Sequence, residues 1–265
     1  MIRLFAILLT LVITNVALQP PRSSAAAEIP ADWKIDNVRR SESARGTETV
    51  EILNLHGDLR IRPTDEDEIY LSAMIQRHAD DPLRAEIATG HEDSTLHLDV
   101  SYPEIDGFVP AEQPADWRKR RVDLTVFVPA KRPLTIETDR GLLEVKGLDH
   151  GITARSAHGD IVLATGGPVT ARTERGSITC RFTDSDWPRP AELETLTGSI
   201  TVTLPAAADT TVIMTTLGEL TTDFSLTVTR PSDSERKTAR AIIGKGTVEL
   251  LMTSNRGNLK LLRQP

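Results

Sequence analysis

The sequence predicts an all-β protein, specifically a right-handed parallel β-solenoid (β-helix-like) of short Gly-centred repeats. Apolar and polar residues alternate with the period of two that is typical of half-buried strands. Five glycines between residues 141 and 218 follow one another at intervals of 18, 17, 22 and 20 residues. Repeats of that length are typical of solenoids, in which each unit buries its apolar face against its neighbours. The right hand follows the general preference of crossovers between parallel strands.

Seven segments align on a glycine, and the aligned positions share one chemical pattern. The residue five places before the glycine and the residue two places after it are apolar in every copy. These offsets describe two alternating runs with one change of phase at the glycine, as a turn or bulge with glycine at positive φ would produce. The seven glycines are Gly57, Gly141, Gly159, Gly176, Gly198, Gly218 and Gly257.

A small polar residue stands three places before each glycine, on the face predicted to point inward. In a stack of parallel repeats these side chains form an internal ladder, and we expect like residues to hydrogen-bond along it. The predicted ladder consists of Asn54, Thr138, Ser156, Thr173, Thr195, Thr215 and Ser254.

The repeated spacing Thr-x-x-Gly-x-Ile-x-Val, which follows an apolar strand end such as Val126–Pro129, resembles the bacterial putative-adhesin domain family of unknown function. The resemblance covers Glu48 to Leu262. It implies a β-solenoid on the cell surface or in the cell envelope. That family has no established catalytic residues, so the resemblance assigns none to this chain.

The N-terminal segment, residues 1–27, is typical of a secretory signal peptide. Arg3 supplies the basic start, Leu4 to Leu18 the apolar stretch, and Ser24 to Ala27 a small-residue cleavage site. The apolar stretch is shorter than the roughly 20 residues that span a bilayer, although an uncleaved anchor is an alternative. Cleavage near Ala27 predicts an exported protein, periplasmic, on the cell surface or secreted, with no membrane span in the mature chain.

Charge argues against a nucleic-acid partner. The whole chain carries a formal charge of −7, and removing residues 1–27 removes two arginines and no acid, which leaves −9. Binding to a polyphosphate backbone requires the opposite balance.

The mature chain then divides into a lead-in and one domain. Residues 28–47 are polar and predict a linker or irregular lead-in, and residues 48–262 form the adhesin-like β-solenoid domain. Strands are predicted at Ile69–Ile75 and Thr95–Val100, and a short helical turn at Asp80–Ala88.

Three polar stretches interrupt the domain. Thr64 to Glu68 predicts an acidic solvated turn, with a weak calcium site as the alternative. Residues 101–121 and 230–240 predict loop insertions rich in proline or charge. The first ends in the basic cluster Trp117–Arg121, which is either a solvated loop or a contact for an anionic polymer.

The residue before each glycine suggests a candidate ligand-binding edge. Stacking would line up cations at Arg140, His158, Arg175 and Arg256, which we call the basic edge. Such an edge could bind phosphate or carboxylate groups of an envelope polymer. The alternative is a solvated edge that Asp139 and Glu174 neutralise.

His-Gly-Asp occurs at both His56 and His158. A histidine beside an aspartate fits metal or acid–base chemistry, but its place in a variable turn favours an exposed turn residue. Cys180 is alone, so no internal disulfide forms, and its inward position predicts a core residue rather than a reactive thiol.

The sequence predicts no catalytic, cofactor or metal site. We therefore expect a non-catalytic adhesin-like protein that contacts an envelope polymer, a glycan or a protein. Two alternatives remain. A glycan-active β-helix enzyme would need outward carboxylates grouped on neighbouring repeats. An envelope regulatory module would need a bare apolar patch or an unpaired end repeat for a protein partner.

Overall fold

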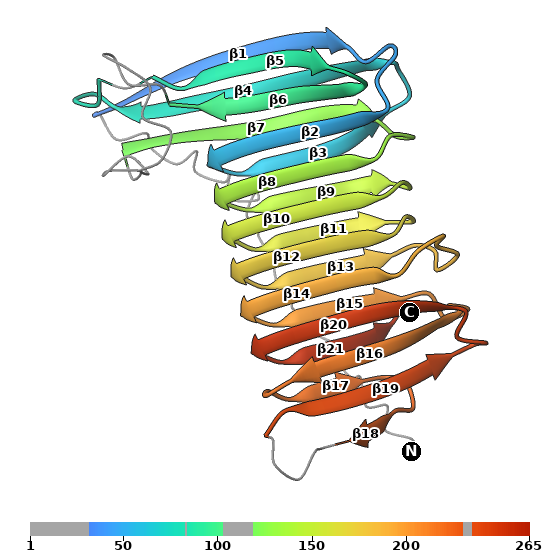
Figure 1. Ribbon diagram of the computed structural model, residues 1–265. Helices are drawn as coiled ribbons and strands as arrows, with labels where there is room; N and C mark the ends of the chain where they lie inside the picture. The colour runs from blue at the N-terminus through green and yellow to red at the C-terminus, as the bar shows by residue number, and fades with distance from the viewer. Residues whose placement is uncertain (1–31, 83, 103–118, 230–234) are drawn as a thin grey trace, which may run out of the picture. The chain divides into compact units, whose positions relative to one another are not determined.

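The computed structural model describes residues 32–82, 84–102, 119–229 and 235–265. The prediction of an all-β protein is confirmed: strands account for 67% of the structure, and the described residues hold no α-helix. The strands form two large, mostly parallel sheets of ten and eleven strands (Figure 1). None of the described segments is a helix long and apolar enough to cross a bilayer. The predicted signal peptide lies outside the described residues.

The strands run as follows: β1 Trp33–Ser43, β2 Thr49–His56, β3 Leu59–Thr64, β4 Glu68–His78, β5 Glu86–Glu92, β6 Thr95–Ser101, β7 Arg120–Pro129, β8 Leu134–Arg140, β9 Leu143–Leu148, β10 Ile152–His158, β11 Ile161–Thr165, β12 Val169–Arg175, β13 Ile178–Phe182, β14 Ala191–Thr197, β15 Ile200–Leu204, β16 Thr210–Thr216, β17 Leu220–Thr222, β18 Thr227–Thr229, β19 Lys237–Ile243, β20 Val248–Arg256 and β21 Leu259–Arg263.

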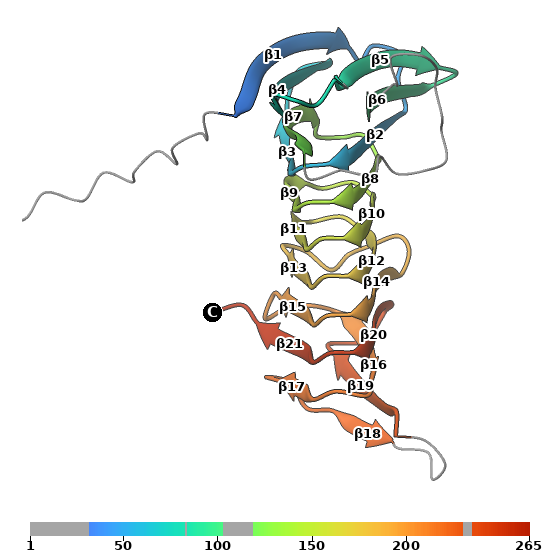
Figure 2. The same ribbon diagram turned by 90° about the vertical axis from the view of Figure 1, so that its left-hand side faces the viewer.

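Each glycine repeat contributes one strand to each sheet. The strand before the glycine joins the eleven-stranded sheet and the strand after it joins the ten-stranded sheet, as β8 and β9 do at Gly141. Strands from successive repeats then pair in parallel, residue for residue, as Ile152 does with Val169. The two views in Figures 1 and 2 show these strand pairs following one another along both sheets.

The core lies between the two sheets and contains the apolar positions that the alignment on the glycines predicted to face inward. Two places after the glycine, Leu59, Leu143, Ile161, Ile178, Ile200 and Leu259 are all fully buried. Five places before it, Ile52, Ile136, Ala154, Ala171, Leu193 and Met252 are buried as well. Cys180 is a buried core residue as predicted, and burial in apolar surroundings raises the pKa of its thiol, which makes it unreactive.

In the Gly218 repeat, the residues predicted to face inward are wrong. The sequence places Ile213 and Thr215 inward, whereas the structure pairs Thr216 with Ser254 and turns Thr215 outward, 3.5 Å from the Thr238 hydroxyl. Both alternating sets of this strand contain apolar residues, so periodicity does not choose between them. Burial of Met214 and Thr216 sets the register, and the turn before Gly218 is one residue shorter than in the other repeats.

The order of repeats in space departs from their order in the chain near the C-terminus. Strand β20 pairs with β14 on one side and with β16 on the other, and β21 lies between β15 and β17. The Gly257 repeat therefore inserts between the Gly198 and Gly218 repeats. At the N-terminal end, β6 and β7 pair with β2 and β3, which themselves pair with β8 and β9.

Antiparallel strands complete both sheets. β1 pairs with β4 and β4 with β7, β5 pairs with β6, and β19 pairs with both β16 and β18. These strands correct several predictions. β1 lies within residues 28–47, where we expected an irregular lead-in, and its eleven residues pair with β4. None of these residues is fully buried, so the sequence gives no clear alternation that would have predicted the strand.

The other differences concern loops. β5 takes up part of the predicted helical turn at Asp80–Ala88, and β19 begins at Lys237, inside the insertion predicted at residues 230–240. β6 ends at Ser101 and β7 begins at Arg120, so the insertion predicted at residues 101–121 is shortened at its C-terminal end. Its residues 103–118 lie outside the described residues.

Candidate functional site

The turn that joins the two strands of each repeat has a glycine because no side chain fits there. A Cβ atom on each of the seven glycines would lie 1.8 to 2.3 Å from a carbonyl oxygen of the adjacent repeat or, for Gly57, of Val122 in β7. For Gly176 that oxygen belongs to Gly159, at 2.0 Å. A positive φ, which we had expected at every copy, occurs only at Gly57, Gly141 and Gly198. Close approach of neighbouring backbones is thus the shared requirement.

Four of the residues three places before the glycine form an internal polar ladder, whereas the hydroxyls of Thr138 and Ser156 are buried without a hydrogen-bond partner among the described residues. The hydrogen bonds of the ladder run from side chain to backbone rather than between like side chains, as the sequence had predicted. Thr173, Thr195 and Ser254 each donate a hydroxyl hydrogen bond of 2.9–3.0 Å to the glycine carbonyl of a neighbouring repeat. Asn54 donates to the carbonyl of Val122 at 2.9 Å, and Thr216 replaces Thr215 by donating to Gly257 at 2.6 Å.

A second ladder follows the glycine, and the sequence analysis missed it. The side chain one place after the glycine accepts a hydrogen bond from the backbone N–H one place after the next glycine. Asp160 accepts from Ser177 at 2.7 Å, and Asn258 accepts from Glu219 at 2.9 Å. Asp58 accepts from Leu142 at 3.0 Å. Small polar residues stand at this position in five of the seven copies, all except Leu142 and Glu219, and they were the signal. It explains why aspartate follows glycine in both His-Gly-Asp motifs: each carboxylate holds a neighbouring repeat.

The basic edge lies on neighbouring strands of the eleven-stranded sheet. The register places His56, Arg140, His158, Arg175, Thr197 and Arg256 beside one another in that order. Thr197 therefore separates Arg256 from the other three cations of the edge.

Asp139 neutralises the first half of this edge. Its carboxylate lies 3.2 Å from Arg140 Nε, 3.4 Å from His158 Nδ1 and 3.9 Å from His56 Nδ1. His56 is only 3% exposed, which contradicts the expectation of an exposed turn residue. Burial lowers the pKa of His56, more than the nearby Asp139 carboxylate raises it. His56 is therefore a neutral, buried side chain at neutral pH.

The second half of the edge is different. Arg175 and Arg256 are both exposed, and neither forms an ion pair with any described residue. Strand spacing places their backbones about 10 Å apart, with Thr197 between them. Of the four predicted cations, these two are the ones available to an external anion.

Arg120, which the sequence placed in a cluster that is either a solvated loop or a contact for an anionic polymer, is buried. It lies at the start of β7 with 6% exposure, and its guanidinium group forms two hydrogen bonds with Asp81, at 2.8 and 3.0 Å. The Tyr102 ring lies 5.6 Å from the guanidinium carbon. This pair fastens the start of β7 to the end of β4 and is structural.

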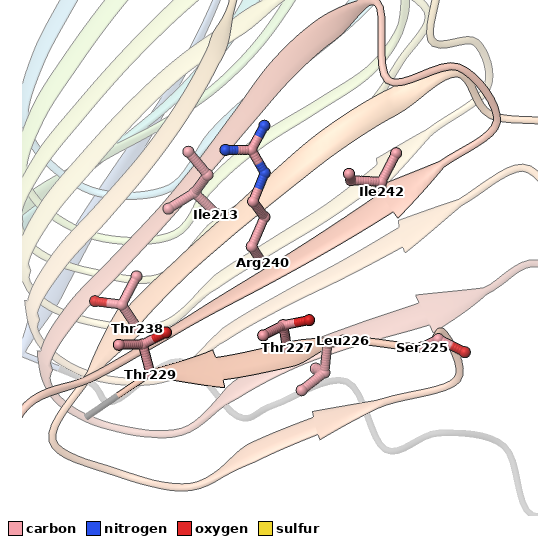
Figure 3. A pocket seen from close by; sticks show the side chains of 8 residues that line it. All are labelled: Ile213, Ser225, Leu226, Thr227, Thr229, Thr238, Arg240 and Ile242. Atoms are coloured by element: carbon pink, nitrogen blue, oxygen red, sulfur yellow. The ribbon is translucent and has the colours of Figure 1, made fainter.

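A groove of about 620 Å³ lies at the C-terminal end of the eleven-stranded sheet (Figure 3). Ile213 from β16 and Ile242 from β19 line it, together with Leu226 just before β18. Ile242 is 63% exposed, the largest value among the exposed large hydrophobic residues of the described chain. Arg240 supplies the charged group, and Figure 3 shows it extending beside Ile213. Such a groove favours contact with a partly apolar partner.

The acidic turn connects β3 to β4, as the sequence predicted. Asp67 pairs with Arg132 at 3.1 Å, and the Tyr70 hydroxyl donates a hydrogen bond to Glu66. No group of three or more potential metal ligands occurs among the described residues. Asp67 and Glu66 of this turn thus bond to neighbouring side chains on the surface of the ten-stranded sheet.

Known structures resemble this chain in fold. A putative cell adhesion protein from Clostridium sporogenes superposes with a TM-score of 0.51 at 12% identity, over 87% of this chain and all of that one. A putative adhesin from Bacteroides fragilis matches with a TM-score of 0.29 at 13% identity, over 86% of this chain and 97% of that one. No family model matches the chain, and no curated protein matches it. The resemblance to bacterial putative adhesins of unknown function is confirmed for the fold.

Proposed function

We propose that the chain is a non-catalytic, exported protein that mediates contact at the cell surface or in the cell envelope, and that its repeats form a right-handed β-solenoid. The alternation of strands between two parallel sheets supports the solenoid. Export rests on the predicted signal peptide at residues 1–27. The fold that the chain shares with the putative cell adhesion protein of Clostridium sporogenes supports the contact role.

The observation that carries the proposal is the second half of the basic edge. The turns of neighbouring repeats use their polar groups to hold one another, through the ladders before and after the glycine. Arg175 and Arg256 remain exposed, on a rigid backbone and at a fixed spacing. A rigid pair of cations suits a polymer with regularly spaced anionic groups, because little ordering entropy is lost on binding.

The same geometry argues for a non-catalytic role. The aspartates of the two His-Gly-Asp motifs, Asp58 and Asp160, accept backbone hydrogen bonds from the next repeat. His56 is buried, and His158 faces Asp139. These groups are committed to the fold, so neither motif supplies a histidine and an aspartate that face a substrate together. A glycan-active enzyme remains the alternative if carboxylates elsewhere bind calcium or cleave a glycan.

Binding of a soluble anionic polymer to the purified protein tests the proposal. A teichoic-acid-type polyphosphate serves as the ligand, at two salt concentrations. We expect saturable binding that weakens with salt, and a loss of that binding in the double variant Arg175→Gln/Arg256→Gln. The matched control is Arg140→Gln, which removes a cation already paired with Asp139. Equal effects of the control and the double variant would remove the basic edge from the account.

A second candidate, a regulatory module with a protein partner, is favoured by the groove at the C-terminal end. Ile242 is exposed there, and within the described residues β17 pairs only with β21. The substitution Ile242→Lys would abolish capture of such a partner and leave polymer binding at Arg175 intact. The reverse pattern would assign the polymer to this end of the sheet.

A further inference from the structure

The outer face of the ten-stranded sheet holds two aromatic rings that lie directly opposite one another. Tyr70 on β4 pairs with Phe127 on β7 in antiparallel register. Each stands between two buried neighbours of its strand, so both side chains point away from the core. Opposed residues of an antiparallel pair have Cβ atoms about 4.5–5.5 Å apart. Both side chains line the same shallow cavity, and we call this pair the aromatic platform.

The platform is exposed, and the fold does not require it. Phe127 is 41% exposed and is the residue that breaks the alternation of apolar and polar side chains along β7. A buried aromatic ring would stabilise the core, whereas a ring on the solvent side leaves apolar area in water. A shallow cavity of about 410 Å³ lies over this face, lined by Tyr70 and Phe127 together with residues of β1. Its size lies within the usual range of ligand sites.

Polar groups surround the rings on the β1 side. Ser41 lies opposite Tyr70, and in the next row Arg39 lies opposite Ser72. Arg39 is exposed and forms no ion pair with a described residue, whereas Arg62, opposite Phe127 on the other side, pairs with Glu144. Of these two arginines, Arg39 on the β1 side is therefore the one that lacks an ion pair with a described residue.

The Tyr70 ring is held in place from outside the platform. Its hydroxyl donates a hydrogen bond to Glu66 in the acidic turn, and this bond, together with the nearby Glu68 carboxylate, raises the pKa of the phenol. Tyr70 therefore stays protonated at all physiological pH values. A ring fixed by its hydroxyl loses less rotational freedom when a ligand stacks on its face, which favours binding.

From this arrangement we propose that the aromatic platform binds an acidic glycan. The apolar C–H face of one or two sugar rings stacks on Tyr70 and Phe127, hydroxyl groups bond to Ser41 and Ser72, and a uronate carboxylate pairs with Arg39. Sugars are amphipathic in this way, and aromatic side chains match them with an apolar face at small entropic cost. A protein partner would favour a wider apolar surface than two rings beside a cation.

This inference rests on the proposed contact role and names the ligand class and a second surface for it. The platform lies on the outer face of the ten-stranded sheet, whereas the basic edge belongs to strands of the eleven-stranded sheet. Loss of one surface therefore leaves the other intact, and the two can be tested apart.

Calorimetric titration of the purified protein with a galacturonate hexamer, and separately with neutral cellohexaose, tests the proposal. We expect the uronate hexamer to bind more tightly than the neutral one. Phe127→Ala should lower its affinity about tenfold, the scale of one aromatic contact, and Tyr70→Ala should act similarly. Phe127→Tyr should bind like the wild type. Arg39→Gln should remove the preference for the uronate and the salt dependence, while the neutral hexamer binds as before.

Met74→Ala is the matched control. Met74 is 39% exposed on the same face of β4 but does not line the cavity, so its loss should leave affinity unchanged. Thermal melting of every variant shows that the sheet persists. Failure of both hexamers to bind the folded wild type would overturn the platform, as would equal affinities of wild type and Phe127→Ala. In either case, polymer binding that still depends on Arg175 and Arg256 would leave the proposed function standing.

Discussion

The central repeats and the two ends of the sheets use the same glycine turn but differ in how chain order relates to position. From β8 to β15, each repeat lies beside the one that follows it in the chain, and every pair of strands is parallel. At the ends, repeats insert out of order and antiparallel strands complete the sheets. Local sequence pattern therefore determines the geometry of a repeat, whereas the neighbours of that repeat depend on which strand edges remain available.

The largest effect should come from adding one methyl group to a central turn. In Gly176→Ala the new Cβ would lie 2.0 Å from the Gly159 carbonyl oxygen, with repeats packed on both sides that prevent relief. We expect a loss of about 4 kcal/mol or more in the free energy of unfolding, measured by urea denaturation. Gly90→Ala is the control, since nothing lies within 4 Å of its added Cβ. Similar stability of the two variants would mean that the central repeats do not approach this closely.

A smaller loss is expected at the N-terminal end, where a buried ion pair adds to the close contact at Gly57. Asp81→Ala leaves the Arg120 guanidinium group buried without its carboxylate. Removing one partner of such a pair costs about 3 kcal/mol. Arg121→Ala, which removes a neighbouring but 43% exposed guanidinium group, should cost far less. Denaturation midpoints of the two variants check this, and equal midpoints would contradict the buried pair.

Two adjacent threonines sharpen the comparison at the C-terminal end. Thr216→Val removes the hydroxyl that donates to the Gly257 carbonyl and should cost about 1–2 kcal/mol, because that carbonyl is left without this donor. Thr215→Val changes an outward side chain and should cost under about 0.5 kcal/mol. The opposite ranking in the free energy of unfolding would restore the register that the sequence alone predicted.

The smallest effect concerns pH. Burial lowers the pKa of His56 in the folded protein below its ordinary value of 6.5. Below pH 6.5 the unfolded chain therefore binds this proton more readily, so stability should decline as pH falls from 7 to 5. His56→Gln should flatten that decline, measured as the free energy of unfolding by urea denaturation at pH 7 and pH 5. An unchanged pH dependence in His56→Gln would show that this imidazole does not titrate in the core.

The sequence predicted the central repeats because their pattern is local. The glycine turn, the inward residues such as Ile161 and Ile178, and the polar residues Thr173 and Thr195 all lie within one repeat. The predicted hydrogen-bond partners were wrong, because the glycine carbonyls that accept those bonds come close only once the repeats are stacked.

The ends escaped prediction for a different reason. β1 has no fully buried residue, and only partly buried side chains such as Val38 pack against the core, so its sequence shows no clear alternation. Its pairing with β4 is made by backbone groups that every residue shares. The candidate sites divide in the same way. Alignment found Arg175 and Arg256, whereas the pairing of Tyr70 with Phe127 depends on the register between β4 and β7.

The most direct test of this account is the position of the Gly257 repeat. In a Cys180→Ala background, one variant carries cysteines at positions 197 and 256, which are paired in register, and another carries them at positions 197 and 217. Neighbouring strands place backbones about 4.8 Å apart, within the range a disulfide spans. The account predicts rapid oxidation of the 197/256 pair, measured by non-reducing electrophoresis, and slow oxidation of the 197/217 pair. Preferential oxidation of the 197/217 pair would mean that the repeats follow one another in chain order to the end, and would contradict the arrangement described above.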